Sequence, residues 1–244
     1  MRADVLLVQR GLAETRERAR RLIMAGRARV GTETLVKPAT LLDESAPIEL
    51  LATERYVSRG GQKLEAALAT FEVDPTGLAC LDLGASTGGF SDCLLQHGAA
   101  SVLAVDVGRA QLHQKLRDDP RVTLLEGVNA RSLPLLPRVD FFVADVSFIS
   151  LRKVLPSVAE RVPPGTRGVV LLKPQFEAGP ADVPRGGVIR DATVRERVLE
   201  EFVGWLASEG WKLLGTVECP VRGGEGNVEY LVHLETALEP GQLC

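Results

Sequence analysis

From residue 79 onward the sequence alternates short apolar runs with longer amphipathic stretches. The apolar runs are Ala79–Leu83, Ser101–Val105, Val122–Leu125, Asp140–Ala144 and Gly168–Leu172. Helical patterns fill the gaps, at about residues 61–71, 89–97, 109–117, 150–161 and 193–208. Strands that are apolar on both faces are typical of a parallel sheet with helices on either side. The sequence therefore predicts an α/β fold with a doubly wound, mostly parallel sheet.

The final two strand-like segments depart from this alternation. Only a glycine-rich loop separates Lys212–Glu218 from Val228–Glu235, and it is too short for a crossover helix. The two segments are therefore predicted to pair as an antiparallel hairpin. A parallel sheet that ends in such a hairpin resembles the Rossmann-like sheet of methyltransferases.

The first 52 residues have a different pattern and form a separate predicted module. Residues 2–10 and the stretch after Thr15 are predicted helices, with Thr15 as the N-cap of the second and Gly26 just beyond its end. Two short strands are predicted around a turn at Gly31, and a third at Ile48–Leu51. We therefore expect a small α+β domain at 1–52, a linker at 53–59 and the α/β domain at 60–244.

Charge is distributed unevenly along the chain. Residues 1–63 carry 12 Lys+Arg against 8 Asp+Glu, whereas residues 64–244 carry 17 against 24. A small basic module on an acidic body is typical of a polyanion-binding domain, and arginine forks pair well with phosphates. A solvated helix face would give the same pattern, so both interpretations stay open. The candidate RNA-binding residues are Arg10, Arg16, Arg18, Arg20, Arg21, Arg27 and Arg29.

Composition excludes several classes of protein. The 244 residues are 45% hydrophobic and 25% charged, which is ordinary for a globular chain and unlike a disordered, collagen-like or disulfide-rich protein. The longest stretch without Asp, Glu, Lys or Arg has 13 residues, too few to span a bilayer as a helix. We see neither a signal peptide nor a cluster of metal ligands. The scattered cysteines indicate reduced thiols and a cytoplasmic location; they are Cys80, Cys93, Cys219 and Cys244.

A glycine-rich loop follows the first apolar strand of the α/β domain. In the segment LDLGASTGGF, Gly84, Gly88 and Gly89 allow a sharp turn and a close approach of the backbone to a ligand. Asp106 ends the next strand, where a carboxylate is placed to accept hydrogen bonds from the ribose hydroxyls of a nucleoside. The alternative is that Asp106 caps a helix that starts near Arg109. The two features together favour a nucleoside site.

The same loop also matches the nucleophile-elbow motif of hydrolases. Residues 84–88 read G-x-S-x-G, with Ser86 as the serine, and His233 follows late in the chain. The elbow strand would be the first of the sheet, with no upstream loop to supply the second oxyanion donor. His233 lies in an alternating strand pattern, where a packed histidine is the commoner outcome. A hydrolase is therefore disfavoured.

Charged residues stand where several predicted strands end or begin. Lys173 ends the most apolar run, and burial there would favour its neutral amine. Asp145 ends the neighbouring strand, so the two are expected to pair at the ligand-binding edge of the sheet. Glu229 begins the last strand, and Lys63 opens the helix before the first strand. Apart from Lys173, each of these residues taken alone is more often an ordinary surface charge.

As a set, Lys63, Asp145, Lys173 and Glu229 resemble the Lys–Asp–Lys–Glu tetrad of FtsJ-type ribose 2′-O-methyltransferases. The whole chain resembles the TlyA family of ribosomal RNA cytidine 2′-O-methyltransferases, also known as haemolysin A. The matching stretches are YVSRGGQKL, LDLGASTGGFSDCLL, AVDVG, DVSFISL, LLKPQFE and GNVEY. Residues 1–52 resemble the ribosomal-protein S-four type RNA-binding domain of that family.

The resemblance implies S-adenosylmethionine as cofactor and a cytidine ribose in ribosomal RNA as substrate. It implies Lys173 as the base, Asp145 as its partner, and Lys63 and Glu229 as residues that orient the ribose. Asn129 stands where many methyltransferases have an acidic residue near the adenine, so an amide contact, or none, is expected there. The expected cofactor contacts are Gly84, Ala85, Ser86, Thr87, Gly88, Gly89, Phe90, Asp106, Val107, Asn129 and Asp145.

The substrate and partner also have alternatives. The chain resembles the shorter subgroup of the family, for which large-subunit rRNA is the expected target. A membrane-active haemolysin finds no support, because no spanning segment and no strongly amphipathic apolar helix is predicted. A non-catalytic RNA-binding protein that aids ribosome assembly is disfavoured by the complete tetrad and cofactor loop. We therefore expect the ribosomal subunit, and no membrane, as the partner.

Overall fold

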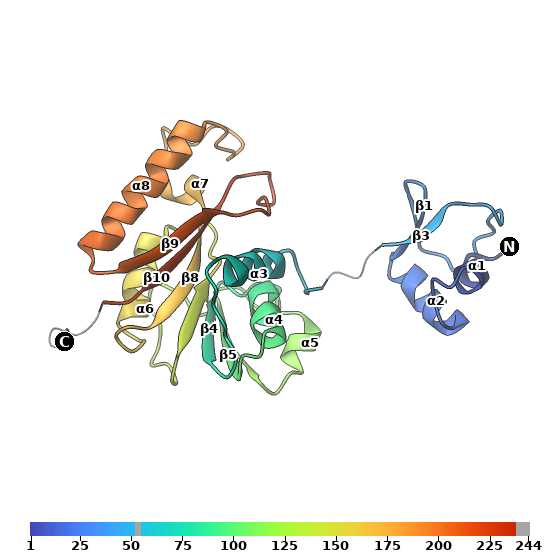
Figure 1. The fold of residues 1–244 in the computed structure, drawn as a ribbon, viewed down its shortest axis with the longest axis horizontal. Coiled ribbons are helices and arrows are strands. Elements are labelled where there is room, and N and C mark those ends of the chain that lie inside the picture. The colour runs from blue at the N-terminus through green and yellow to red at the C-terminus, as the bar shows by residue number, and fades with distance from the viewer. Residues whose placement is uncertain (52–54, 238–244) are drawn as a thin grey trace. The chain divides into compact units, whose positions relative to one another are not determined.

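The computed structural model describes residues 1–51 and 55–237, which belong to two compact units (Figure 1). The units are Met1–Arg55 and Tyr56–Cys244, so their boundary falls inside the predicted linker 53–59. Residues 53 and 54 lie outside the described residues. Tyr56 is only 3% exposed, and the N–H of Val57 donates to the Asp92 carboxylate. Residues 56–59 are therefore packed into the second unit and are not a linker.

The first unit consists of two helices and a small antiparallel sheet. Its helices are α1 (Ala3–Gln9) and α2 (Arg16–Met24), and its strands are β1 (Ala28–Val30), β2 (Glu33–Leu35) and β3 (Ile48–Leu50), in the order β2-β1-β3. The Thr15 hydroxyl accepts the N–H of Arg18, which confirms the predicted N-cap of α2. Gly26 adopts φ +67°, as a residue just beyond a helix end often does. Leu6, Leu7 and Ile23 form the buried centre of this unit.

The second unit is built on one seven-stranded sheet. Its strands are β4 (Ala79–Leu83), β5 (Ser101–Asp106), β6 (Val122–Glu126), β7 (Phe141–Ala144), β8 (Arg167–Leu172), β9 (Lys212–Glu218) and β10 (Tyr230–Glu235), in the order β6-β5-β4-β7-β8-β10-β9. Strands β4 to β8 are parallel, and β10 runs antiparallel between β8 and β9. The predicted sheet with its final hairpin is confirmed. The strand order reverses at β4, which is where open α/β sheets bind ligands.

Helices cover both faces of this sheet (Figure 1). One face packs against α6 (Leu155–Ala159) and α8 (Ala192–Ser208), with Phe142, Leu155 and Phe202 in its core. The other face packs against α3 (Gly60–Thr70) and α4 (Gly89–Gln96). Burial on both faces explains why the central strands read as uninterrupted apolar runs.

Two predicted helices are shorter than expected, and one short helix was not predicted. Region 109–117 is helical only at α5 (Gln114–Arg117), because Ala110 adopts φ +56°, which an α-helix does not allow. Region 150–161 divides into a 3₁₀ turn (Leu151–Lys153) and α6, since Pro156 has no N–H with which to continue one helix. Helix α7 (Pro174–Glu177) is too short to leave a periodic pattern.

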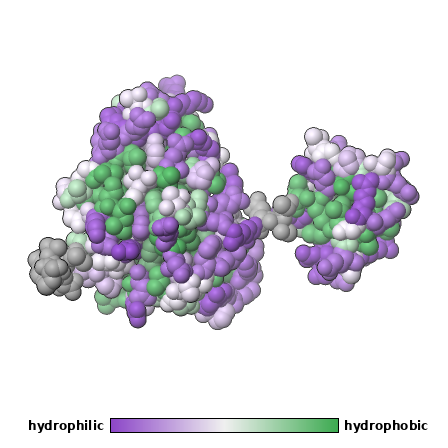
Figure 2. All heavy atoms as spheres, in the orientation of Figure 1, coloured by the Kyte–Doolittle hydropathy of each residue, from purple (hydrophilic) through white to green (hydrophobic). Residues whose placement is uncertain are grey.

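The surface is mostly hydrophilic on the face that Figure 2 shows, with apolar residues between the polar ones. Phe148 stands out, because its side chain is apolar and aromatic yet 91% exposed.

Within residues 1–51 and 55–237, no helix is long and apolar enough to cross a membrane.

Candidate active site

The loop between β4 and α4 is held tightly against the ends of two neighbouring strands. The N–H groups of Gly84 and Ala85 donate to the oxygen of Val105 in β5, at 2.9 and 3.2 Å. Gly84 adopts φ +79°, and a Cβ there would lie 2.7 Å from the backbone oxygen of Asp145. Only glycine fits between these strands at position 84. Because the loop follows β4, it lies at the point where the strand order reverses.

Asp106 is fastened to this loop. One carboxylate oxygen accepts the N–H of Ser86 at 2.7 Å, and the other accepts the N–H of Gly108 at 2.6 Å. No helix begins near Arg109, so the alternative role of Asp106 as a helix cap is wrong. Each oxygen keeps a further lone pair for a ligand hydroxyl.

A cavity of about 830 Å³ opens beside this loop. The predicted cofactor residues that line it are Gly84, Ser86, Asp106, Val107, Asn129 and Asp145. Carboxylate oxygens on one wall and valine side chains on another suit a nucleoside, whose ribose is polar and whose base is flat and apolar. The side-chain oxygen of Asn129 accepts the N–H of Arg131, which leaves its NH₂ group to donate. The donor set therefore fits the adenosyl part of S-adenosylmethionine.

A second cavity of about 250 Å³ adjoins the first one. Ala85, Thr87, Gly89 and Phe90 line this smaller cavity, whereas Gly88 lines neither, because it packs against the side chain of Leu116. The smaller cavity also receives Arg59, Lys63, Lys173 and Arg222. Four residues line both cavities: Gly84, Ser86, Asp145 and Ser147.

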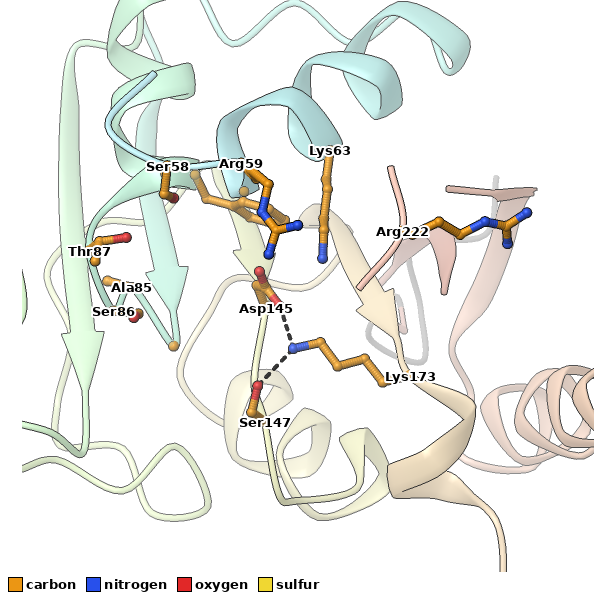
Figure 3. A pocket seen from close by; sticks show the side chains of 14 residues that line it. Ser58, Arg59, Lys63, Ala85, Ser86, Thr87, Asp145, Ser147, Lys173 and Arg222 are labelled. Carbon is orange, nitrogen blue, oxygen red and sulfur yellow. Dashed lines mark hydrogen bonds and ion pairs between the residues drawn. The ribbon is translucent and has the colours of Figure 1, made fainter. Parts of the chain in front are cut away.

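Lys173, which lines the smaller cavity, forms an ion pair with Asp145 on this shared wall. The Nζ atom of Lys173 lies 2.7 Å from Asp145 Oδ1 and donates to Ser147 Oγ at 2.8 Å (Figure 3). The predicted pairing is confirmed, and its basis is that both residues follow neighbouring parallel strands. Lys173 is only 8% exposed.

Lys63 and Glu229 form a second ion pair, at 2.5 Å between Nζ and Oε2. They lie 166 residues apart in sequence, on α3 and just before β10. Their exposed fractions are 8% and 3%, so this pair is the more enclosed of the two. Lys63 points from α3 toward the region of Asp145 and Lys173 (Figure 3). The structure thus brings Lys63, Asp145 and Lys173 together around one small cavity, and Glu229 is joined to them through its ion pair with Lys63.

Comparison with known proteins identifies the protein family to which this chain belongs. Residues 56–236 match the FtsJ-like methyltransferase family, and residues 1–48 match the S4 domain. The chain belongs to the FtsJ-like methyltransferase family. It is therefore a methyltransferase, with an S4 domain at its N-terminus.

Relatives of this methyltransferase share almost its whole length. It is 45% identical over 240 residues to the 16S/23S rRNA (cytidine-2′-O)-methyltransferase TlyA of Mycobacterium tuberculosis, covering 96% of this chain and 90% of that one. It is 35% identical over 205 residues to the 23S rRNA (cytidine-2′-O)-methyltransferase TlyA of Campylobacter jejuni, covering 83% and 79%. A solved structure described as a hemolysin from Streptococcus thermophilus matches with 42% identity and a TM-score of 0.75, covering 97% and 88%.

Sequence reasoning missed one buried carboxyl of the methyltransferase domain. Asp82 in β4 has no exposed surface, and the hydroxyl of Ser91 donates to it at 2.6 Å. Burial, together with the nearby carboxylates of Asp145 and Asp106, raises the pKa of Asp82 to about 7. The available signal was an acidic residue in the middle of an apolar run.

Two smaller features were also missed. Ser147 is a hydrogen-bond partner of Lys173 that no motif indicated. Glu177 in α7 accepts the hydroxyl of Ser150 at 2.7 Å and the N–H of Leu151 at 2.6 Å, and thereby fixes the segment that follows β7. Burial raises the pKa of Glu177.

The hydrolase alternative is not supported by the geometry. Ser86 lies at the carboxyl ends of the parallel strands, whereas His233 pairs with Val169 and lines a cavity with Asp140 and Gly165 at their amino ends. His233 packs against Phe71, with ring centroids 5.3 Å apart. In the described parts of the chain, no group of three or more His, Cys, Asp or Glu residues is placed to hold a metal ion.

The seven candidate RNA-binding arginines of the S4 domain fall into three groups. Four contact groups of their own unit: Arg10 with the oxygen of Glu44, Arg16 with Asp4, Arg21 with Glu17 and Arg29 with Glu49. Arg27 is half-buried just after α2. Arg18 and Arg20 are exposed and have no ion-pair partner among residues 1–51 and 55–237. These two are the arginines best placed to meet a phosphate.

Proposed function

We propose that this methyltransferase transfers a methyl group from S-adenosylmethionine to the ribose 2′-hydroxyl of a cytidine in large-subunit ribosomal RNA. The observation that carries the proposal is the position of the Lys173–Asp145 pair. It stands between a cavity that suits a nucleoside and a smaller one with several cationic side chains. A reacting hydroxyl in the smaller cavity would therefore meet both a proton acceptor and the methyl donor.

In this mechanism Lys173 is the general base. After the ion pair with Asp145 has released a proton to solvent, its amine would accept the proton of the 2′-hydroxyl at Nζ. The ribose oxygen would take the methyl group as the bond between the methyl carbon and the sulfonium breaks and a neutral thioether leaves. Asp145 stabilises the ammonium that forms, and the hydroxyl of Ser147 fixes the direction of Nζ. S-adenosylmethionine, when bound, supplies a methyl group that is already activated, so positioning contributes much of the rate.

Lys63 and Glu229 orient the substrate. Because Glu229 neutralises and fixes Lys63 in a nearly closed setting, Lys63 can present a fixed donor to a ribose in the smaller cavity, and Glu229 orients the ribose through Lys63. Asp106 would hold the ribose of the cofactor in the larger cavity, next to the loop Gly84–Gly89.

The surroundings of the smaller cavity suit RNA. Its lining has four cationic side chains and one acidic side chain, Asp145. The cationic ones are Arg59, Lys63, Lys173 and Arg222. Phe148 lines the larger cavity, is 91% exposed, and has its ring centroid 5.2 Å from that of Phe176. An exposed aromatic ring beside a cationic pocket is a platform on which an unstacked base can rest.

The choice of nucleotide and subunit rests on relatives. The Campylobacter jejuni protein is named for 23S rRNA, and the Mycobacterium tuberculosis protein for both 16S and 23S rRNA. Both names specify the cytidine 2′-oxygen. We take the large subunit as the substrate, the S4 domain as the part that binds its RNA, and the cytoplasm as the place of action.

The proposal is tested by incubating the protein with methyl-labelled S-adenosylmethionine and separately purified ribosomal subunits. We expect label in the RNA of the large subunit and none in its proteins. Label in small-subunit RNA alone would overturn the choice of subunit. No incorporation into either subunit, with cofactor binding intact, would favour the non-catalytic alternative.

The haemolysin alternative has its own test, because two similar structures and one relative carry that word in their names. Leakage of dye from liposomes would be compared between the protein and a denatured sample. We expect no difference between the two. Rapid leakage caused only by the folded protein would support the alternative.

A further inference from the structure

The connection between α7 and α8 has no regular structure over residues 178–190, yet it is firmly held. Asn227, which is 4% exposed, binds it with both ends of its amide. Its Nδ2 donates to the oxygen of Gly187 at 3.0 Å, and its Oδ1 accepts the N–H of Ile189 at 3.1 Å. A buried asparagine that is satisfied only by this segment fixes the segment against the loop before β10.

Helix α8 holds the same segment from the other side. Arg195 Nη1 donates to the oxygens of Ile189 at 3.2 Å and Arg190 at 2.6 Å, and Arg197 pairs with Asp182 at 2.8 Å. Ile189 itself is 2% exposed. The segment is therefore a rigid part of the surface.

The outermost part of the segment is a tight turn with an arginine at its corner. The N–H of Gly187 donates to the oxygen of Pro184 at 3.0 Å, which closes a four-residue turn. Gly186 has φ +99°, the conformation for which such turns need glycine. Arg185 is consequently presented outward from a fixed backbone.

The loop 222–227 lies between this segment and the smaller cavity. A Cβ on Gly187 would lie 3.5 Å from Glu225, and one on Gly224 would lie 3.8 Å from Arg59. A Cβ on Gly223 would lie 2.7 Å from the carboxylate of Glu229. The loop 222–227 therefore connects the segment to Arg59, which lines the smaller cavity, and to Glu229, which pairs with Lys63 in the same lining.

We propose that the segment 184–190 is a second RNA-binding surface, in which Arg185 and Arg190 contact phosphates of the strand that enters the catalytic cavity. Both side chains are exposed, and neither has an ion-pair partner in the described part of the chain. Guanidinium groups held on a fixed backbone bind phosphates with little loss of conformational freedom. The proposal rests on RNA being the substrate, as argued above, and adds a contact that is independent of the S4 domain.

Asn227 is a positioning residue for this surface. Asn227→Ala leaves both arginines in the chain but releases the turn that carries Arg185. It should therefore weaken RNA binding in the same direction as removing the arginines, whereas a purely stabilising role would lower the thermal midpoint without changing affinity. Thr236→Val is a control for the loss of a buried hydrogen bond, because Thr236 caps the other end of β10 through the N–H of Thr166.

The test measures binding of purified large ribosomal subunits to the full-length double variant Arg185→Gln/Arg190→Gln at several salt concentrations. We expect about tenfold weaker binding and a salt slope smaller by about 1.5, as for the loss of two phosphate contacts. The affinity for S-adenosylmethionine should not change. The control Arg121→Gln/Arg138→Gln removes the same charge at the amino ends of the strands, where both arginines pair with aspartates, and should bind as the unmodified protein does.

An affinity and a salt slope equal to those of the unmodified protein would overturn the proposal. So would an Asn227→Ala variant that binds normally and only turns over more slowly, because the segment would then act through Glu229. The readout is binding, so a protein that binds subunits through this surface without methylating them would contradict the proposed function alone.

Discussion

Among residues 1–51 and 55–237, two carboxyl side chains have no exposed surface, one in each unit, and their surroundings are opposite. Asp4 in the first unit accepts hydrogen bonds from Arg2 and Arg16 at 3.0 to 3.1 Å, and these guanidinium groups lower the pKa of Asp4 to about 2. Asp82 in the second unit accepts the hydroxyl of Ser91 and has no cation beside it, and burial, together with the carboxylates of Asp145 and Asp106, raises its pKa to about 7.

The difference shows how each unit uses its cations. In the first unit arginines stabilise a buried charge, so part of its basic excess is structural. In the second unit no cation is placed beside Asp82, while Lys63, Lys173 and Arg59 are kept at the smaller cavity. We infer that cations at the cavity serve the reaction and that those around Asp4 serve the fold. The predictions below test this separation.

The largest effect is expected at Lys173. Lys173→Ala should lower kcat by about two to four powers of ten, the usual contribution of a positioned acid–base group. Lys173→Arg keeps a cation but not a base, so its kcat should be nearly as low. Single-turnover methylation of ribosomal subunits measures both, and calorimetry should show unchanged cofactor binding. An Arg variant with most of its activity would make Lys173 an electrostatic anchor and the general-base role wrong.

Asp82 should make the stability of the second unit depend on pH. Because its folded pKa is about 7 and its ordinary value is 3.8, the folded state keeps a proton that the unfolded state loses. The free energy of unfolding should thus fall as pH rises from about 4 to 7, by at most roughly 4 kcal/mol, and level off above pH 7. Asp82→Asn should remove this slope. Trp205 and Trp211 both lie in the second unit, so tryptophan fluorescence follows it specifically.

The control for this experiment is Ser91→Ala. It removes the hydroxyl that donates to Asp82 and favours its ionised form, so the fall in stability should extend to higher pH. An Asp82→Asn variant with the slope of the unmodified protein would mean that other groups cause the pH dependence.

Asp106 tests whether the larger cavity holds the cofactor. Asp106→Ala should weaken S-adenosylmethionine binding by about 1.5–3 kcal/mol, the range for hydrogen bonds to a charged group. Calorimetry measures the change directly, with Asp140→Ala as a control at the opposite end of the strands. An unchanged dissociation constant for Asp106→Ala would remove this residue from the site.

The smallest effect per residue is expected in the S4 domain. Its arginines directly test the distinction between cations that stabilise the fold and cations that bind RNA. Arg18→Gln/Arg20→Gln should weaken binding of ribosomal subunits and flatten its salt dependence, by about one phosphate contact per residue. Arg16→Gln should instead lower the stability of the first unit, because it removes a partner of buried Asp4. Equal loss of RNA affinity in both cases would show that Arg16 also binds RNA.

The sheet could be predicted because a strand that is buried on both faces has an uninterrupted run of apolar residues. The Lys173–Asp145 pair followed from it, since the ends of neighbouring parallel strands must meet. The hairpin followed from a loop too short to cross the sheet. These features are determined by local pattern and chain connectivity.

Other features depend on contacts that no local pattern contains. Lys63 and Glu229 meet across 166 residues, and only the resemblance grouped them beforehand. The fastening of Asp106 to Ser86 requires a left-handed backbone at a residue other than glycine. The role of Asn227 depends on two irregular segments that periodicity does not describe.

The central claim is that this protein methylates a ribose oxygen of ribosomal RNA. Its most direct test is to treat large-subunit RNA with alkali after reaction, because a 2′-O-methyl group protects the following phosphodiester bond. We predict one alkali-resistant position, at a cytidine, that appears with the unmodified protein and not with Lys173→Ala. Incorporated methyl groups that leave every bond alkali-sensitive would place the modification on a base and contradict the account.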